Sequence, residues 1–376
     1  MDDDFIKPNP IRDSTNKLKL SVFGANGKGG AFTFHPDRFS GDWDANVRVA
    51  KKADELGIEG FVSASRWRAF GRGGHYSGDV METLTWAGAI AAVTERISVI
   101  STVAVSLINP AFVAKAEATI DLISRGRAGM NLVCGWFQPE FDLFGVELKE
   151  HSDRYAYGDQ WMEVFDKLWS STEEFDLHNE AFSVKDAISQ PRPLQSRPVL
   201  LNAGGSPRGR QFAAQHAEVA FTIPDDPDPR AVKERVAEYR EDARKKFGKE
   251  IQIWLSAYVV QEDTTAEAEA YAHDYIVTQG DDEAVMEMIT ANIPNSQTMP
   301  AGRMAEMAYE FKAGYGAYPL VGSASDIAKR IGELSDAGVD GLMLLWLDYE
   351  DGLAKFAADV LPRLEEAGLR SPAASE

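Results

Sequence analysis

Short apolar stretches alternate with amphipathic stretches along most of the chain, and this alternation limits the fold more than any other feature of the sequence. Eight stretches predict strands: Leu18–Phe23, Gly60–Ser63, Ile97–Ala104, Gly129–Cys134, Pro198–Asn202, Glu218–Thr222, Ile251–Val260 and Gly341–Leu347. Between them, apolar residues such as Trp43, Val47, Ala50 and Ala53 recur every three or four positions, which is typical of helices. Eight such units predict a closed (β/α)8 TIM barrel, with an open doubly wound sheet as the alternative.

The same pattern indicates one domain. We expect a single barrel over residues 18–370, after an N-terminal arm at 1–17 and before a short tail at 371–376. Three stretches exceed the usual connection of about two to six residues, so we expect them to be insertions at the C-terminal face of the barrel. They are 24–42, 170–197 and 280–322. The last combines prolines and glycines with short Met-rich helical pieces, and it is the predicted lid.

The charge balance argues against several classes of partner. The 376 residues include 39 lysines and arginines against 59 aspartates and glutamates, a net charge of −20. Such a field repels nucleic-acid phosphates and anionic lipid head groups, and no apolar run approaches the roughly 20 residues that span a bilayer. A single cysteine, Cys134, and an N-terminal stretch without an apolar core predict a cytoplasmic protein. The six histidines show no paired spacing, so we expect no metal site.

The residues that follow the predicted strands are informative, because a barrel builds its active site from these loops. The second strand runs into SASRWRAFGRGGH, which contains Arg66, Trp67 and His75. The fourth runs into GWFQPE, where Gly135 interrupts the strand and Trp136 follows at once. Arginines, tryptophans and glycine turns on one rim suit a flat, anionic, aromatic ligand, although the tryptophans could also be plain hydrophobic covers for their loops.

The stretch NAGGSPRG at 202–209 predicts an anion-binding turn. Ser206 suits a helix N-cap and the proline after it suits the first helical position, so free backbone N–H groups and the helix dipole should point at the loop. Gly204 and Gly205 would let a phosphate approach the backbone closely, and Arg208 could add charge. An ordinary strand-to-helix turn with a plain cap is the alternative.

Two other catalytic motifs fail on their spacing. A nucleophile elbow needs a glycine two residues after the serine, where this chain has Arg208. The stretch GANGKGG at 24–30 does not match G-x-G-x-x-G in register and runs into a long loop instead of a helix. The sequence therefore argues against a serine hydrolase and a dinucleotide-binding protein.

Four stretches together resemble the bacterial-luciferase-like, flavin-dependent monooxygenases. They are ATIDLISRGRAGMNLVCGWFQPEFDLFG (118–145), DRYAYGDQW (153–161), the NAGGSPRG turn and LVGSASDIAKRI (320–331). They span most of the chain in the family's order, and the run N-L-V-x-G-W followed by P-E is most similar to the group that contains pyrimidine monooxygenase, dimethyl sulfone monooxygenase and riboflavin lyase. The resemblance implies a barrel of the bacterial luciferase type that takes reduced FMN and O2.

The resemblance also assigns residues to the site. Together with the glycines of the anion-binding turn, the expected FMN-binding residues are Ser65, Arg66, Asn131, Glu140, Arg154, Tyr155, Gly204, Gly205 and Ser206. Asn131, Trp136 and Arg66 are the expected catalytic residues, because Asn131 can hydrogen-bond the reacting edge of the ring and Trp136 can shield it from water. Arg66, Trp67, His75 and Trp136 are the expected substrate-binding residues.

The implied activity is an FMN-dependent monooxygenase that cleaves a C–N bond of a pyrimidine-like or flavin-like substrate. A planar arginine fork can bind paired carbonyl oxygens, which favours an N-heterocycle, although it would also suit the oxygens of a sulfone or sulfonate. A separate NAD(P)H:flavin reductase would supply the reduced FMN, and we expect a homo-oligomer, either a dimer or a tetramer. A deazaflavin-dependent or flavin-dependent oxidoreductase, or a flavin-binding protein without oxygenation, is the alternative from another class.

Overall fold

Eight parallel strands close into a barrel at the centre of the molecule. The computed structural model describes residues 5–71, 75–223, 226–292 and 299–373. The barrel strands are β1 (Lys19–Phe23), β2 (Gly60–Val62), β3 (Ser98–Ala104), β4 (Ala128–Val133), β7 (Val199–Asn202), β8 (Val219–Thr222), β9 (Gln252–Gln261) and β11 (Gly341–Leu345). Each pairs in parallel with the next, and β11 pairs with β1. The predicted (β/α)8 barrel is therefore confirmed.

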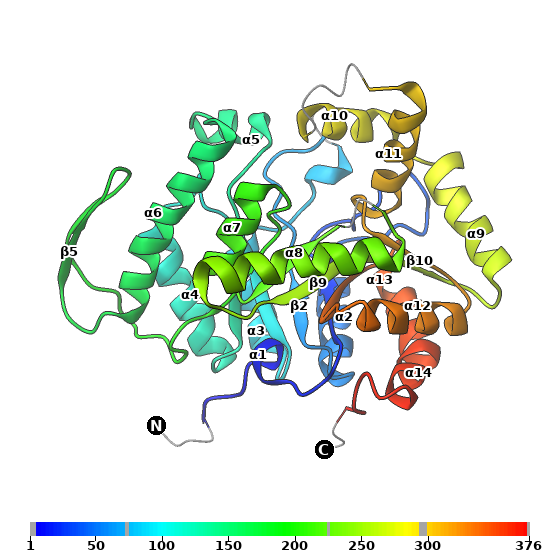
Figure 1. Cartoon of the computed structure of the whole chain (residues 1–376), viewed down its shortest axis with the longest axis horizontal. Coiled ribbons are helices and arrows are strands. Elements are labelled where there is room, and N and C mark those ends of the chain that lie inside the picture. Colours follow the sequence, from blue (N-terminus) through cyan, green and yellow to red (C-terminus); the bar gives the residue numbers. More distant parts are fainter. Residues whose placement is uncertain (1–4, 72–74, 224–225, 293–298, 374–376) are drawn as a thin grey trace.

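In the described part of the chain, three further strands lie outside the barrel wall, and the sequence patterns did not predict them. β10 (Tyr318–Gly322) pairs in parallel with the second half of β9, beyond the end of β8. β5 (Phe175–His178) and β6 (Ser183–Ala187) form an antiparallel hairpin, which Figure 1 shows at the edge of the molecule beside α6 (His151–Ser170). β10 is short and contains a proline, and the hairpin is largely exposed, so neither has a long apolar run.

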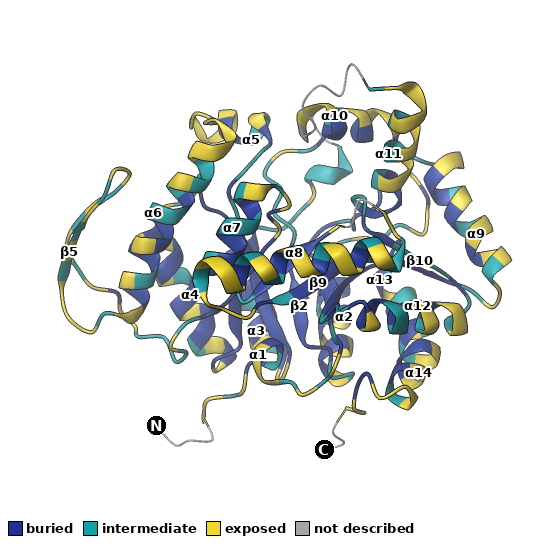
Figure 2. Ribbon diagram, viewed as in Figure 1, coloured by how far each residue is buried: buried dark blue, intermediate teal, exposed yellow. Residues whose placement is uncertain are grey.

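Helices surround the barrel and cover its strands. The principal crossover helices are α2 (Trp43–Glu55), α3 (Thr83–Val93), α4 (Pro110–Ser124), α6, α7 (Pro207–His216), α8 (Pro229–Phe247), α12 (Ala324–Asp336) and α13 (Tyr349–Lys355), which α14 (Leu361–Glu366) follows. Side chains cap the start of several of them; for example, the Asp42 carboxylate accepts a hydrogen bond from Ala45 N at the start of α2. Figure 2 shows buried strands inside and helices that expose one face. Among the described residues, no helix is long and apolar enough to cross a membrane.

Segments near the two ends of the chain seal the amino-terminal end of the barrel. α1 (Pro10–Asp13), in the expected N-terminal arm, inserts Ile11, which is fully buried. A Cβ added at Gly60 would lie 3.3 Å from the Ile11 side chain, so the glycine makes room for this plug. Arg370 forms a buried ion pair with Glu59, which also accepts a hydrogen bond from Leu20 N. This end is closed, so the opposite end is left for function.

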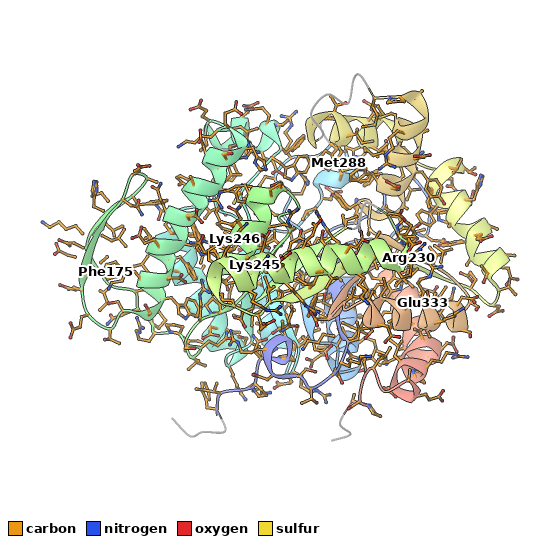
Figure 3. The ribbon with its side chains drawn as sticks, viewed as in Figure 1. Phe175, Arg230, Lys245, Lys246, Met288 and Glu333 are labelled. Carbon is orange, nitrogen blue, oxygen red and sulfur yellow. The ribbon has the colours of Figure 1, made fainter. Side chains whose placement is uncertain are left out.

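Four more helices lie around the carboxyl end of the barrel, namely α5 (Gln138–Phe144), α9 (Thr265–His273), α10 (Asp282–Asn292) and α11 (Ala301–Gly314). In Figure 1, α5, α10 and α11 lie at the top, opposite α1 and α14. The inner face of α10, which includes Met288 (Figure 3), packs on Phe32, Phe70 and Phe137 from three barrel loops. Of the predicted lid, residues 293–298 lie outside the described residues.

Candidate active site

Asn131 lies on the inward-facing side of β4, level with Thr102 of β3 and Leu201 of β7. Its side chain is 2% exposed. Its Nδ2 donates to the Thr102 hydroxyl at 3.2 Å, whereas its Oδ1 has no partner among the described residues. A buried amide oxygen without a hydrogen bond is destabilising, so this atom is suited to accept one from a ligand or a water molecule.

Neighbouring strands fix the orientation of the Asn131 amide. The Thr102 hydroxyl donates to the Ser63 carbonyl of the β2 segment, so it can only accept from Asn131. The Ser63 hydroxyl in turn accepts from Thr102 N at 2.9 Å. Two strands therefore hold the amide with its nitrogen toward Thr102 and its oxygen unpaired.

The chain turns sharply after β4. Gly135 has a φ of +90°, and a Cβ there would lie 2.5 Å from the Phe141 ring, so both the backbone and the packing require glycine. The turn places Trp136 over the barrel mouth and starts α5, whose first turn carries Glu140. Cys134 lies just before the turn, and burial raises its pKa to about 12, so it remains a thiol.

Arg66, from the loop after β2, lies in a buried cluster at the mouth of the barrel, which we call the arginine box (Arg66, Phe70, Trp136, Phe137 and Glu140). Its side chain is 8% exposed, and its Nη1 is 3.1 Å from Oε1 of Glu140. Three rings surround the guanidinium: its Cζ lies 4.3 Å from the centroid of Phe70, 5.3 Å from that of Trp136 and 5.4 Å from that of Phe137. Its buried Nε has no partner among the described residues. The guanidinium is therefore a buried cation with an N–H group still available to a ligand.

Trp67 and His75 are held by other parts of the protein. The Trp67 ring packs edge-on against Phe144 of α5, with centroids 4.9 Å apart. Nε2 of His75 lies 2.6 Å from Oδ2 of the buried Asp281, and its Nδ1 lies 2.9 Å from the Ser77 hydroxyl. Both ring nitrogens of His75 therefore have protein partners, and the histidine ties the β2 loop to the start of α10.

A cavity lies beside Arg66, at the ends of β1, β2 and β11. It is narrow, because only about 20 Å³ of it is accessible to a water molecule. Much of its wall is the glycine-rich stretch 24–30, and Arg66, Tyr76 and Tyr315 also line it. Ser65, the residue before Arg66, is half-buried, and no hydrogen bond of its hydroxyl occurs within the described residues. The cavity is mostly apolar and contains one buried cation, Arg66.

A second polar cluster lies where α6 and α7 begin, and we call it the anion cradle (His151, Arg154, Tyr155, Gly204, Gly205, Ser206 and Arg208). Ser206 caps α7 as expected, because its hydroxyl accepts a hydrogen bond from Gly209 N at 3.0 Å. The same hydroxyl lies 3.2 Å from Nε2 of His151 on α6. Burial raises the pKa of Tyr155 to about 12, so its phenol is a neutral donor at pH 7.

Two arginines supply charge to the anion cradle. Arg154 donates from Nη1 to the Lys149 carbonyl, and its buried Nε has no partner among the described residues. Arg208 pairs with Asp159, which also lies 2.8 Å from Nε2 of His216. Burial alone would raise the pKa of Asp159, but the His216 hydrogen bond and the Arg208 charge outweigh it and hold the pKa below its usual value. Asp159 is therefore an anion that orients Arg208.

The two glycines of the turn differ in their surroundings. A Cβ at Gly204 would lie 2.5 Å from the Gly209 carbonyl oxygen, so the fold itself requires glycine there. A Cβ at Gly205 would meet nothing closer than Arg235 Nη2 at 3.6 Å. Tyr239 donates to the Gly204 carbonyl at 3.0 Å and Arg235 to the Gly205 carbonyl at 2.9 Å, which fixes the turn.

The structure groups the expected residues into two sets joined by β4. Arg66, Trp136 and Glu140 meet at the mouth, Arg154, Tyr155, Gly204, Gly205 and Ser206 meet in the anion cradle, and Asn131 lies between them on the barrel wall. Thr102 and His151 were not predicted from the sequence. Their polar character was visible, but their partners are 29 and 55 residues away. Among the described residues, no group of three or more His, Cys, Asp or Glu is placed to hold a metal ion.

Comparison with known proteins agrees with the barrel fold. The model of the luciferase-like monooxygenase family matches residues 23–341. The chain is 28% identical to pyrimidine monooxygenase RutA of Enterobacter sp. (strain 638) over 93% of its own length and 96% of that protein. It is 29% identical to the FMNH(2)-dependent dimethylsulfone monooxygenase of Pseudomonas putida over 88% of its length and 90% of that protein. A crystal structure of riboflavin lyase (RcaE) with modified FMN and riboflavin has a similar fold, with a TM-score of 0.85, 23% identity and coverage of 96% and 94% of the two chains.

Proposed function

Because this chain belongs to the luciferase-like monooxygenase family, we propose that it uses reduced FMN and O2 to cleave a C–N bond of a small N-heterocyclic substrate. Two relatives are named for pyrimidine and dimethylsulfone oxygenation, and the latter is named as FMNH(2)-dependent. The observation that carries the proposal is the pairing of an anion cradle with a buried arginine box on one barrel rim, with the unpaired Asn131 amide oxygen between them.

FMN fits the polar groups that the protein leaves without partners. Its phosphate would be held by Ser206, Arg154 and Tyr155 and by the backbone at Gly204 and Gly205, where two helix starts favour an anion. The unpaired Nε of Arg154 is one donor available to it. Asn131 would contact the ring, with Ser65, Arg66 and Glu140 at its far side.

The reduced flavin, when bound, supplies the electrons that activate O2. Asn131 would hold its amide at the reacting edge of the ring, in an orientation that Thr102 fixes. Trp136, with Phe70 and Phe137 packed beside it, would keep water from that edge. The predicted lid was 280–322, but its last residues form β10, which is hydrogen-bonded to β9, so we also propose that the part before β10 closes over the ligands, since α10 packs on the same ring cluster. Limited proteolysis with and without FMN and substrate would test this lid.

Arg66 would bind the substrate. The Glu140 carboxylate holds one side of its guanidinium, which leaves Nε for a substrate oxygen. A planar donor fork between aromatic rings suits a flat ring with neighbouring carbonyls, as in a pyrimidine or a flavin. A sulfone or sulfonate would use the same donors. We place Trp67 and His75 around this site, although the partners of His75 favour a positioning role.

The proposal implies a second protein. A separate NAD(P)H:flavin reductase would supply reduced FMN by diffusion, in the cytoplasm, and we expect the chain to act as a homo-oligomer. The test is a coupled assay with purified chain, a flavin reductase, NADH and FMN, in which uracil, riboflavin and dimethyl sulfone are offered separately. Consumption of uracil or riboflavin that depends on the chain, on FMN and on O2 supports the proposal. Consumption of dimethyl sulfone alone favours the C–S alternative, whereas flavin binding with no oxygenated product favours a non-oxygenating flavoprotein.

A further inference from the structure

The anion cradle contains a histidine whose neighbours are mostly cationic. His151 begins α6, and its Nε2 lies 3.2 Å from the hydroxyl of Ser206, the N-cap of α7. From α6 it faces Arg154 and the Tyr155 ring, whose centroid is 5.1 Å from its own, and from α7 it faces Arg208. Three basic side chains thus converge on two helix starts, an arrangement that calls for an anion.

Nearby carboxylates do not balance this charge at His151. Asp159 is engaged by Arg208 and His216. Glu150 and Asp153, its neighbours in sequence, are exposed, and neither makes a hydrogen bond to the imidazole. His151 is itself exposed, but its partial burial, and then the charges of Arg154 and Arg208, lower its pKa below the usual value. Without a ligand, the imidazole is therefore mainly neutral at pH 7 and above.

We propose that His151 is a phosphate-binding residue that takes up a proton from solvent when the phosphate of FMN enters the anion cradle. The inference rests on the proposed function, because it takes FMN as the ligand. The bound phosphate dianion would raise the pKa of His151, because its attraction for the imidazolium would outweigh the repulsion from Arg154 and Arg208. Protonated His151 would then donate a charge-assisted hydrogen bond to a phosphate oxygen. The N–H bond that forms on the imidazole takes its proton from a buffer acid or hydronium ion, whose bond to that proton breaks, and no other covalent bond changes.

The proton uptake determines how the affinity for FMN changes with pH. Binding takes up a proton, so the affinity for FMN is greatest where His151 is readily protonated and falls as the pH rises through the pKa of the complex. The limiting slope is about a tenfold loss of affinity per pH unit. The retention of flavin would thus depend on pH, and release would be favoured on the alkaline side.

Calorimetric titration with oxidised FMN at about pH 8, in two buffers of different ionisation enthalpy, measures the protons taken up. At this pH the free phosphate is already doubly charged, because its second pKa is about 6. The wild-type chain should take up a fraction of one proton per FMN. His151→Asn should take up none and bind roughly 10- to 100-fold more weakly at pH 6.5. His151→Lys should keep the affinity, without proton uptake and without the pH slope.

The matched control is His178→Asn, which changes an exposed histidine on the β5–β6 hairpin. It should keep both the proton uptake and the pH slope of the wild type. Equal proton uptake by the wild type and His151→Asn would overturn the inference while leaving FMN as the cofactor. Absence of FMN binding at every pH would instead overturn the proposed function, and this inference with it.

Discussion

The arginine box at the barrel mouth and the anion cradle contain a similar pair of groups in different surroundings. Arg66 pairs with Glu140 and Arg208 pairs with Asp159, but the Arg66 side chain is 8% exposed and that of Arg208 is 26% exposed. Aromatic rings enclose the first pair, whereas helix starts and partly exposed side chains surround the second. An ion pair in water contributes little, but a buried charge that loses its partner is costly. We therefore expect that loss of the arginine will destabilise the protein strongly in the arginine box and only weakly in the anion cradle.

The largest expected effect tests whether burial makes the two ion pairs differ in their contribution to stability. Arg66→Leu would leave Glu140 nearly buried without its cation, and we expect it to lower the free energy of unfolding by about 3–5 kcal/mol. Arg208→Leu should lower it by about 1 kcal/mol or less, because water can reach Asp159. Urea unfolding of both variants measures the difference. Equal losses would mean that burial does not separate the two regions.

The next largest effect concerns Asn131, which lies between the two regions. Asn131→Ala removes an oriented group at the proposed reaction centre but leaves the anion cradle intact. We expect the rate of product formation to fall by about 10²–10³, with only a modest loss of FMN affinity and with hydrogen peroxide released instead of product. Product yield per flavin oxidised in a single turnover, beside a binding titration, tests this. Unchanged yield would make Asn131 a structural amide.

A smaller effect is expected in the cradle. Ser206→Ala and Arg154→Ala would each remove one proposed hydrogen bond to the phosphate, so FMN binding should weaken by roughly 1.5–3 kcal/mol. Riboflavin binding should change less, because riboflavin lacks the phosphate. The control is Arg230→Ala, which changes an exposed arginine on α8 (Figure 3) and should leave both affinities unchanged. Parallel losses for FMN and riboflavin would mean that the cradle does not hold the phosphate.

The smallest effect is expected at Gly205 of the anion cradle, and Gly204 in the same turn provides the comparison. Gly205→Ala places a methyl group where the nearest atom is 3.6 Å away, so we expect less than about 0.5 kcal/mol of destabilisation. Gly204→Ala would bring its Cβ to 2.5 Å from a backbone oxygen and should destabilise the fold markedly. Thermal unfolding of the two variants measures this difference. A large effect at Gly205 would mean that its glycine serves the backbone of the turn and not only a ligand.

The contrast between the regions also explains which features the sequence could predict. The eight barrel strands and the Ser206 cap depend on neighbours a few residues away, and local patterns identified them. β10 was missed because it is short, contains a proline and pairs only with the far half of β9.

The contacts of the site were not predictable in the same way. Arg66 was expected at the rim, but its carboxylate partner is 74 residues away, and the Asp281 partner of His75 is 206 residues away. His151 had no recognisable pattern because Ser206 meets it only when α6 and α7 pack together. The roles of such residues depend on tertiary contacts, which cannot be predicted from periodicity and spacing.

The central claim is that the cradle and the box act on one reduced FMN to insert an atom of O2 into a substrate. The most direct test loads the chain anaerobically with one equivalent of reduced FMN and mixes it with buffer that contains ¹⁸O2 and the substrate identified in the coupled assay. We expect one ¹⁸O atom per molecule of product and a product yield close to the amount of flavin oxidised. Oxidation of the flavin with hydrogen peroxide as the only product of O2, or product oxygen that comes from water, would contradict it.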